Sequence, residues 1–305
     1  MATFTKSVYT FNPVLRDTVI TIGAKKIAYV AYESFTVDTN SEPALDASFS
    51  KFTGATDIVV DLRHNGGGYV TVAEYLINLL APQSSQGKMA FAEYYNATMV
   101  NKQAILLKTQ PVYLNNVRQN YSYYDLDYSV SENTTNVNKK GNFNSSNNVP
   151  TIYFIVSKST ASASELVINS LKPYYNVVLI GAAFSDNGAL TYGKPIGFFE
   201  LRLGTYSVFL SSFETKNAQG AGGYFTGMST NYQAFDDVRF NFGDPNEICF
   251  LRAIRLITGV STYLPGSIAS STLGRSVYSG TTQNMIGRAI GDVSNISGMI
   301  ATPQK

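Results

Sequence analysis

Two stretches of this sequence share one pattern, in which a buried strand passes through a turn of small residues into a helix. The first has a β-branched run at 56–62, a glycine-rich turn at 63–68 and an amphipathic segment at 69–82. The second has an apolar run at 151–157, then small residues and a helical segment at 162–174. Continuous apolar strands are typical of a parallel sheet covered on both faces. The chain is therefore expected to form an α/β fold with a parallel or mixed sheet and helices packed on it.

The rest of the chain adds strands and a polar insertion to this frame. Strands are predicted at 25–35, at 89–97, near 121–130 and at 176–184, with a β-hairpin or meander over 198–220. The Asn-rich stretch 131–148 is predicted to be a long surface loop, and 185–197 a glycine-punctuated loop. The predicted organisation is an extended lead-in at 1–24, one core domain at 25–260 and an irregular tail at 261–305.

Two further helices are predicted from the residues at their ends. Ser41 as N-cap and Pro43 in the first turn indicate a helix over 41–52. A second helix is predicted over 244–259. Its signals are Asp244 as N-cap, Pro245 at the first helical position, Glu247 at the capping-box position and Gly259 after the end.

The composition excludes several classes of function. A net charge of +2 over 305 residues gives no electrostatic basis for binding nucleic acid or an anionic membrane. Cys249 is the only cysteine and His64 the only histidine, which excludes an intrachain disulfide and zinc sites built from several Cys or His ligands. Cys249 is interpreted as a buried structural thiol. No stretch reaches the ~18 apolar residues of a membrane span.

The two turns are candidates for chemistry because each leaves backbone N–H groups at the carboxyl edge of the sheet, where open α/β sheets bind ligands. In the second turn, Ser162 could present its hydroxyl there, with the Ala163 N–H at the helix start able to bind an oxyanion. The alternative is that Ser162 or Thr160 is only the N-cap. For the glycines at 66–68, the alternative is an ordinary strand-to-helix turn.

Lys194 is the candidate base. It lies between Gly193 and Pro195 after a buried strand, and desolvation there would lower its pKa. A neutral lysine can accept a proton from a serine hydroxyl. The alternatives are an ordinary loop lysine, or His64 as the base beside the glycine turn.

Together, three segments resemble the C-terminal processing peptidases, a family that includes the tail-specific proteases and shares its core with the tricorn protease. The segments are DIVVDLRHNGGG, STASASE and YGKPIG, in this order. The resemblance covers roughly residues 13–260. The sequence is similar to the versions of this family that are common in Bacteroidetes, here without a PDZ domain. It implies a mixed sheet with packed helices of the ClpP/crotonase type, a β-rich hairpin region and an irregular C-terminal tail.

The resemblance also implies roles for individual residues. Ser162 matches the nucleophile, Lys194 the general base, and Gly67 and Ala163 the backbone donors of an oxyanion hole. The implied reaction is hydrolysis of a protein or peptide substrate near its C-terminus through an acyl-enzyme, with no metal or other cofactor. The residues expected to neighbour the substrate are His64, Gly66, Gly68 and Tyr192. By family analogy, the protein is expected in the cell envelope or periplasm, for example as a lipoprotein whose signal is missing here.

Two departures from the family pattern concern the lysine. Residues AAFSDNGAL lengthen the segment before TYGK, and Phe198 stands where bacterial members often carry a Gln that orients the base. Two alternative functions therefore stay open. One is a catalytically silent relative that binds peptide tails or hydrophobic ligands, and the other is an esterase-type acyl hydrolase.

Overall fold

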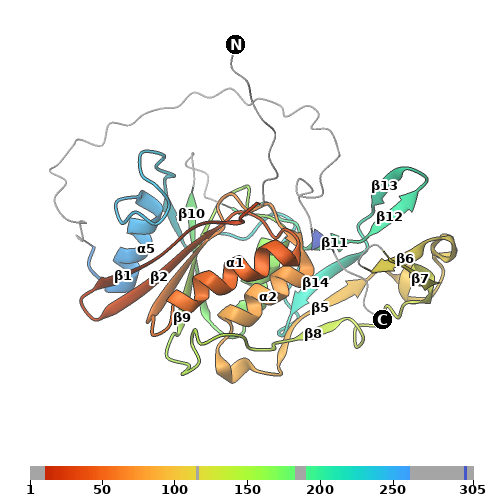
Figure 1. Ribbon diagram of the computed structural model, residues 1–305, viewed down its shortest axis with the longest axis horizontal. Helices are drawn as coiled ribbons and strands as arrows, with labels where there is room; N and C mark the ends of the chain where they lie inside the picture. The colour runs from red at the N-terminus through yellow and green to blue at the C-terminus, as the bar shows by residue number, and fades with distance from the viewer. Residues whose placement is uncertain (1–10, 115–116, 183–189, 262–298, 301–305) are drawn as a thin grey trace, which may run out of the picture.

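The computed structural model describes residues 11–114, 117–182, 190–261 and 299–300, and two six-stranded sheets form its framework (Figure 1). The first sheet has the strand order β1-β2-β3-β9-β10-β15. Its strands are β1 (Val14–Ile22), β2 (Lys25–Tyr32), β3 (Asp57–Asp61), β9 (Thr151–Val156), β10 (Asn176–Ala182) and β15 (Tyr232–Ala234). Only β1 runs antiparallel to its neighbour, so the predicted mixed sheet is confirmed.

The second sheet has the order β4-β16-β11-β14-β5-β8. Its strands are β4 (Gly68–Tyr69), β16 (Met299–Ile300), β11 (Ile196–Phe198), β14 (Phe213–Asn217), β5 (Met89–Tyr95) and β8 (Thr134–Asn136). Two small hairpins project at one end of the molecule (Figure 1). They are β6 (Pro111–Leu114) with β7 (Val117–Ser122), and β12 (Glu200–Leu203) with β13 (Tyr206–Phe209).

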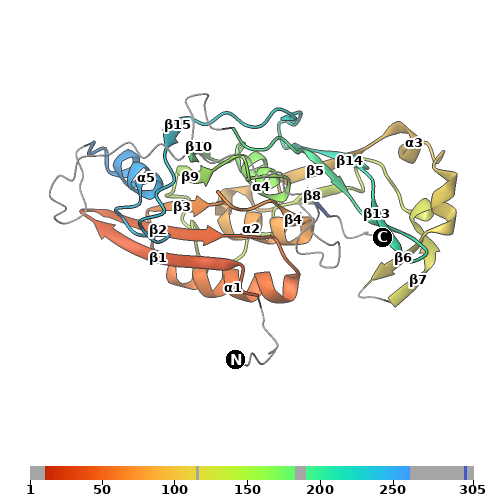
Figure 2. The ribbon, with the colours of Figure 1, turned by 90° about the horizontal axis from the view of Figure 1, so that it is seen from above.

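Helices cover both faces of the first sheet. α1 (Asp38–Lys51), α2 (Val70–Leu80) and α4 (Ala163–Leu171) share one buried apolar cluster with alternate residues of β2, β3 and β9. α5 (Ile248–Thr258) packs on the opposite face, and Figure 2 shows it across the strands from α1. The short helical turns are α3 (Ala97–Val100), η1 (Gln83–Ser85), η2 (Ile105–Thr109) and η3 (Tyr123–Asp125).

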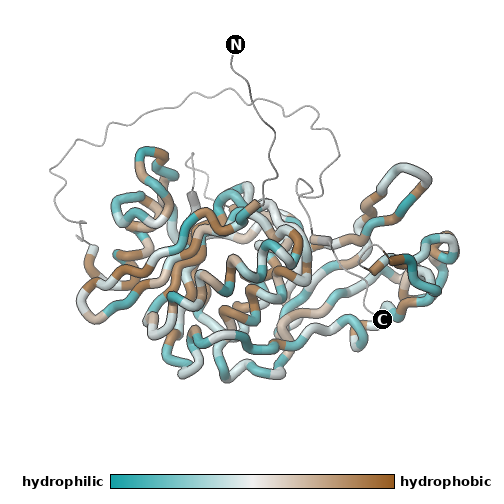
Figure 3. The backbone as a smooth tube through the Cα atoms, in the orientation of Figure 1, coloured by the Kyte–Doolittle hydropathy of each residue, from teal (hydrophilic) through white to brown (hydrophobic). Residues whose placement is uncertain are grey.

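The central strands are apolar because both of their faces are covered. Every residue of β3 is buried, and in Figure 3 hydrophobic colour follows the strands of the first sheet while hydrophilic colour dominates the loops. This arrangement matches the continuous apolar runs of the sequence. Among the described residues, no helix has the length and apolar character needed to cross a membrane.

Both cap-based helix predictions are correct in type and shifted in their start. α1 begins at Asp38, one turn before Ser41, because the Asp38 carboxylate in the first turn suits the helix dipole. α5 begins at Ile248 because the Glu247 side chain, rather than that of Asp244, accepts the N–H groups of Cys249 and Phe250. The helix ends before Gly259, as predicted, and Gly259 adopts the left-handed conformation.

Other segments differ from their predicted conformation. The lead-in is extended as predicted and in addition forms a strand, β1, which pairs with β2 apart from an irregularity between Val14 and Arg16. The stretch 121–130 leaves the strand conformation after Ser122, because Asp125 accepts the Ser122 N–H and hydroxyl and closes a 3₁₀ turn. The insertion 131–148 contributes β8 and buries Phe143 in the main core. Within the predicted irregular tail, residues 299–300 form a strand, while 262–298 and 301–305 lie outside the described residues.

Arg63, at the end of β3, is fully buried and binds three carboxylates. Its guanidinium donates to Asp61, to Asp236 at 2.7 Å and to both oxygens of Glu247 at 2.9 Å. Burial alone would raise the pKa of Glu247, but the Arg63 guanidinium and two amide N–H groups hold it below its ordinary value. This ion cluster joins the end of β3 to the start of α5.

Arg63→Met should therefore destabilise the fold strongly, because it leaves buried carboxylates without their cation. We expect a loss of about 3–5 kcal/mol in the free energy of unfolding, measured by urea denaturation. Arg239→Met is the matched control, since Arg239 pairs with Asp237 but is 64% exposed. It should change stability by no more than about 1 kcal/mol. Equal losses in the two variants would contradict this account of the cluster.

Candidate active site

Ser162 lies where the turn after β9 enters α4, in a strained conformation. Its φ of 60° and ψ of −112° are unusual for a residue with a side chain. The residue is fully buried, and its Oγ makes no hydrogen bond within the described residues. The Ser162 N–H donates to Glu165 Oε2 at 2.8 Å. Ser162 thus holds the N-cap position, but its hydroxyl is not committed to capping the helix.

The glycine turn packs directly against Ser162. Gly67 has a φ of 105°, and a Cβ added there would lie 2.9 Å from Ser162 Cβ and 3.1 Å from Ala163 N. Gly68 has a φ of 140°, and a Cβ there would lie 2.0 Å from the Phe35 carbonyl oxygen. Only glycine combines this conformation with this close approach.

Hydrogen bonds centred on Asn65 fix the two turns to each other. The Asn65 carbonyl accepts from Ala161 N and from Ser164 Oγ, each at 3.1 Å. Its side chain donates to the Tyr32 carbonyl at 3.0 Å and accepts the Gly67 N–H at 2.9 Å. The Gly67 amide predicted to bind an oxyanion is therefore bonded to Asn65 Oδ1 in this structure.

The loop that carries Lys194 joins the same site through the buried carboxylate of Glu165. Glu165 Oε2, which accepts the Ser162 N–H, also accepts the Lys194 N–H at 2.8 Å. Glu165 Oε1 accepts the Gly193 N–H at 2.8 Å and the Thr191 hydroxyl. Residues 162 and 194 are far apart in sequence, yet their backbone N–H groups donate to the same carboxylate oxygen.

The Lys194 side chain is half-buried. Burial lowers the pKa of its ammonium, and the negative charge of Glu165 opposes that shift. Nζ lies 5.6 Å from the centroid of the Phe198 ring, within the range of a cation–π contact. Phe198, which replaces the Gln expected from the family pattern, therefore contacts the ammonium directly.

Two predicted neighbours of the site have side chains directed elsewhere. His64 is 51% exposed, with Nε2 3.7 Å from Asp236 Oδ2 and its ring against Phe242. The Tyr192 side chain is 64% exposed, although its N–H donates to the Thr160 carbonyl at 2.9 Å. Of the predicted residues, the structure therefore brings together the glycine turn, Ser162, Ala163 and the Lys194 backbone.

Glu165 is the site residue whose role the sequence did not reveal. Its place in the first turn of α4 indicated only a favourable charge at a helix start. The signal that was available is the spacing Ser-x-x-Glu over 162–165, which is typical of a capping box. Spacing alone does not show the three further donors from the loop at 191–194.

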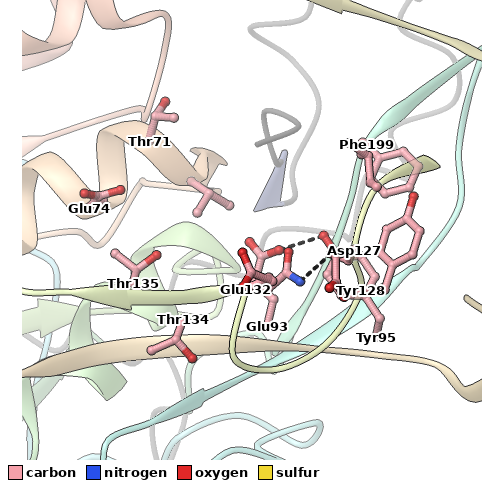
Figure 4. A pocket seen from close by; sticks show the side chains of 13 residues that line it. Thr71, Glu74, Glu93, Tyr95, Asp127, Tyr128, Glu132, Thr134, Thr135 and Phe199 are labelled. Atoms are coloured by element: carbon pink, nitrogen blue, oxygen red, sulfur yellow. Dashed lines mark hydrogen bonds between the residues drawn. The ribbon is translucent and has the colours of Figure 1, made fainter. Parts of the chain in front are cut away.

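A separate cleft lies between α2 and the second sheet. Figure 4 shows it with Thr71 and Glu74 on one side and Tyr95 and Phe199 on the other. Burial raises the pKa of Glu93 in this cleft to about 7, although the hydrogen bond from Tyr95 Oη, at 2.7 Å, counteracts the shift. None of the predicted site residues lines the cleft.

The arrangement can support nucleophilic chemistry without a metal. An uncommitted hydroxyl lies beside the Ala163 N–H, which at the first position of α4 has no partner within the helix. A lysine with a lowered pKa belongs to the adjoining loop. Within the described part of the chain, no cluster of three or more His, Cys, Asp or Glu side chains could hold a metal ion.

Comparisons with known proteins agree with this arrangement. The sequence profile of Peptidase family S41 matches residues 26–198. A candidate S41 protease from Bacteroides fragilis NCTC 9343 is 24% identical with a TM-score of 0.61, and the match covers 84% of this chain and 60% of that one. The chain therefore spans less than two thirds of the length of that relative. No curated protein matches.

Two further solved structures show weaker likeness. The photosystem II D1 C-terminal processing protease is 18% identical with a TM-score of 0.48, over 74% of this chain and 49% of that one. A candidate peptidase from Parabacteroides merdae ATCC 43184 is 16% identical with a TM-score of 0.47, over 78% and 66% of the two chains.

Glu165→Gln should loosen the 191–194 loop, because the amide group replaces one acceptor oxygen with a donor that faces other donors. Leaving buried donors unpaired costs about 1–3 kcal/mol each, so the Gly193 and Lys194 amides should exchange with solvent deuterium at least about tenfold faster. Glu214→Gln is the control, since the Glu214 carboxylate accepts one hydrogen bond within the described part of the chain, from the Gly223 N–H at 2.7 Å, and that bond is solvent-exposed. Unchanged exchange in Glu165→Gln would show that the carboxylate does not hold the loop.

Proposed function

The chain belongs to peptidase family S41, and from this premise we propose that it is a serine endopeptidase with Ser162 as nucleophile and Lys194 as general base. The observation that carries the proposal is the pair of amides, from Ser162 and Lys194, on one oxygen of Glu165. A nucleophile and its base must belong to adjoining segments for a proton to pass between them. The strained, buried Ser162 supports the same assignment.

In the proposed reaction, Ser162 Oγ attacks the carbonyl carbon of the scissile peptide bond, and Lys194 Nζ accepts the hydroxyl proton. The tetrahedral intermediate collapses when the C–N bond breaks, and Lys194 delivers its proton to the leaving amine. Water then hydrolyses the acyl-enzyme by the same sequence, with Lys194 again accepting a proton. Because the lysine must be neutral to begin, its burial favours the reaction.

The oxyanion is assigned to two backbone amides. Ala163 N–H is the first, because it lies at the start of α4 next to the nucleophile. Gly67 N–H is the second, and we propose that it exchanges its bond to Asn65 Oδ1 for the oxyanion during the reaction. The exchange is favourable in direction, since a charged acceptor forms a stronger hydrogen bond than a neutral amide oxygen.

Ser162→Ala should remove turnover of an unstructured protein substrate, by at least about 10⁴-fold, because no other group can form the acyl-enzyme. Lys194→Ala should have a comparable effect. Ser159→Ala and Lys158→Ala are matched controls on the same turn, where both side chains are exposed, and they should keep turnover close to that of the wild type. Circular dichroism checks that each variant is folded.

The same assay tests the substrate class and the alternatives. Mass spectrometry should find cuts near the C-terminus of the substrate, and a serine-directed fluorophosphonate should label Ser162. Labelling with turnover of esters but not of peptides would favour the esterase alternative. If the wild type shows no labelling and no turnover, the binding-protein alternative is favoured. Full turnover in Ser162→Ala would exclude Ser162 as the nucleophile.

Phe198 is proposed to position Lys194 and to favour its charged form. The rate should rise with pH as Lys194 loses its proton, with a midpoint below the ordinary lysine pKa of about 10.4. Removing the ring in Phe198→Leu should move this midpoint lower still, by roughly 0.4–0.7 pH units, which corresponds to a cation–π contact of about 0.5–1 kcal/mol.

Phe209→Leu is the control for Phe198→Leu. Phe209 packs against Phe198 with ring centroids 5.3 Å apart. Replacing it changes the packing around Phe198 but leaves the Phe198 ring beside the Lys194 ammonium. The midpoint of the pH profile should then stay at the wild-type value. An equal shift in both variants would attribute the effect to packing and not to the charge of Lys194.

A further inference from the structure

β16 lies in an unexpected place, between two strands that each continue from a loop of the proposed site. Met299 pairs in parallel with Gly68 of β4 on one side and with Gly197 of β11 on the other. Ile300 is likewise paired with Tyr69 and with Phe198. A two-residue segment from far along the chain therefore joins β4 to β11.

Both flanking strands are tied to the proposed site. β4 begins directly after Gly67, whose backbone packs on Ser162. β11 begins two residues after Lys194. An extended segment between the two strands is therefore flanked by continuations of the glycine turn and the lysine loop.

The walls of this slot are fixed from outside. Phe35 holds β4 on its far side, where the Tyr69 N–H donates to the Phe35 carbonyl at 2.8 Å and the Phe35 N–H to the Gly67 carbonyl at 3.1 Å. β14 holds β11 on its far side, where Gly197 pairs with Phe213. In the order of the second sheet, only β16 separates β4 from β11, so the slot is one strand wide.

The slot also buries an apolar side chain. Met299 has no exposed surface and belongs to the main apolar cluster of the protein. The chemistry of the slot thus suits an extended peptide with an apolar residue at this position, held by backbone hydrogen bonds and one buried side chain.

We propose that the slot between β4 and β11 is the substrate-binding site for an extended peptide, and that Met299–Ile300 is an internal occupant which a substrate must displace. The inference rests on the proposed peptidase function. Two residues form a short strand, so the segment is held by few backbone hydrogen bonds. Its tether of about 40 residues to α5 nevertheless keeps its local concentration high. Self-occupancy therefore raises the substrate concentration needed for turnover.

A disulfide that locks β16 in the slot tests this proposal. Tyr69 and Ile300 are register partners, and neighbouring strands about 4.8 Å apart satisfy the Cα separation of a disulfide. The oxidised Tyr69→Cys/Ile300→Cys protein should lose turnover at least about 100-fold, and a reductant should restore it. The two single variants, which retain the buried Cys249, control for the oxidant. Cross-linked protein, verified by mass, with undiminished turnover would overturn the proposal.

A second variant keeps the proposal testable if the double variant fails to fold. Met299→Asp should expel β16, because its charge cannot be buried, and should lower the KM for a peptide several-fold with little change in kcat. Met299→Leu, which keeps an apolar side chain, should behave as the wild type. An unchanged KM in Met299→Asp would overturn the proposal.

A binding measurement separates failure of this inference from failure of the peptidase proposal. A fluorescent peptide with the sequence NISGMIATP, copied from residues 295–303, should bind Met299→Asp more tightly than the wild type, whether or not the protein hydrolyses peptides. Equal binding to both proteins would overturn the slot inference alone. Absence of turnover and of Ser162 labelling in the wild type would instead overturn the peptidase proposal.

Discussion

The arrangement of the site depends on one buried carboxylate. Glu165 accepts hydrogen bonds from Ser162, Thr191, Gly193 and Lys194, so its two oxygens serve four donors from two separate segments. In a buried environment, moving this side chain would leave those donors unpaired, at a cost of about 1–3 kcal/mol each. The carboxylate therefore fixes the distance between the backbones at 162 and 194 more firmly than the packing of an exposed loop could. Its charge also acts on Lys194, where it partly offsets the effect of burial on the pKa.

The sequence was most informative where a single physical requirement sets the residue types. The strands β3 and β9 are covered on both faces, and their uninterrupted apolar runs identified them. Glycines at 67 and 68 are required by backbone conformation and close approach, which made the turn visible. Helix starts were less well predicted. Glu247, which caps α5, is held by hydrogen bonds from Arg63, a residue far away in sequence. The pairing of β16 was not predictable from the sequence either, because a two-residue strand is too short to show a periodic pattern.

The candidate site was predictable in its parts and not in its connections. The order of strands and turns in the sequence predicts Ser162 and Lys194 at one edge of the sheet. The bonds that join them come from Asn65 and Glu165, which occupy positions where a local role, in a turn or at a helix start, already accounts for the residue type. When one side chain bonds both to a nearby residue and to a distant one, the sequence pattern reveals only the nearby bond. Phe198 illustrates the same limit, because its contact with Lys194 depends on how β11 leaves the loop.

The ion cluster at Arg63 has a consequence for how the protein matures during synthesis. Arg63 emerges from the ribosome well before its partners Asp236, which follows β15, and Glu247, which caps the start of α5. Until that later segment has been translated, the guanidinium lacks two of its three carboxylates, and the end of β3 lacks the contact that seats it. The glycine turn directly follows Arg63, so its final position is reached late, after nearly all of the core has been translated. Gly67, the proposed second oxyanion donor, is therefore among the last parts of the candidate site to reach its final position.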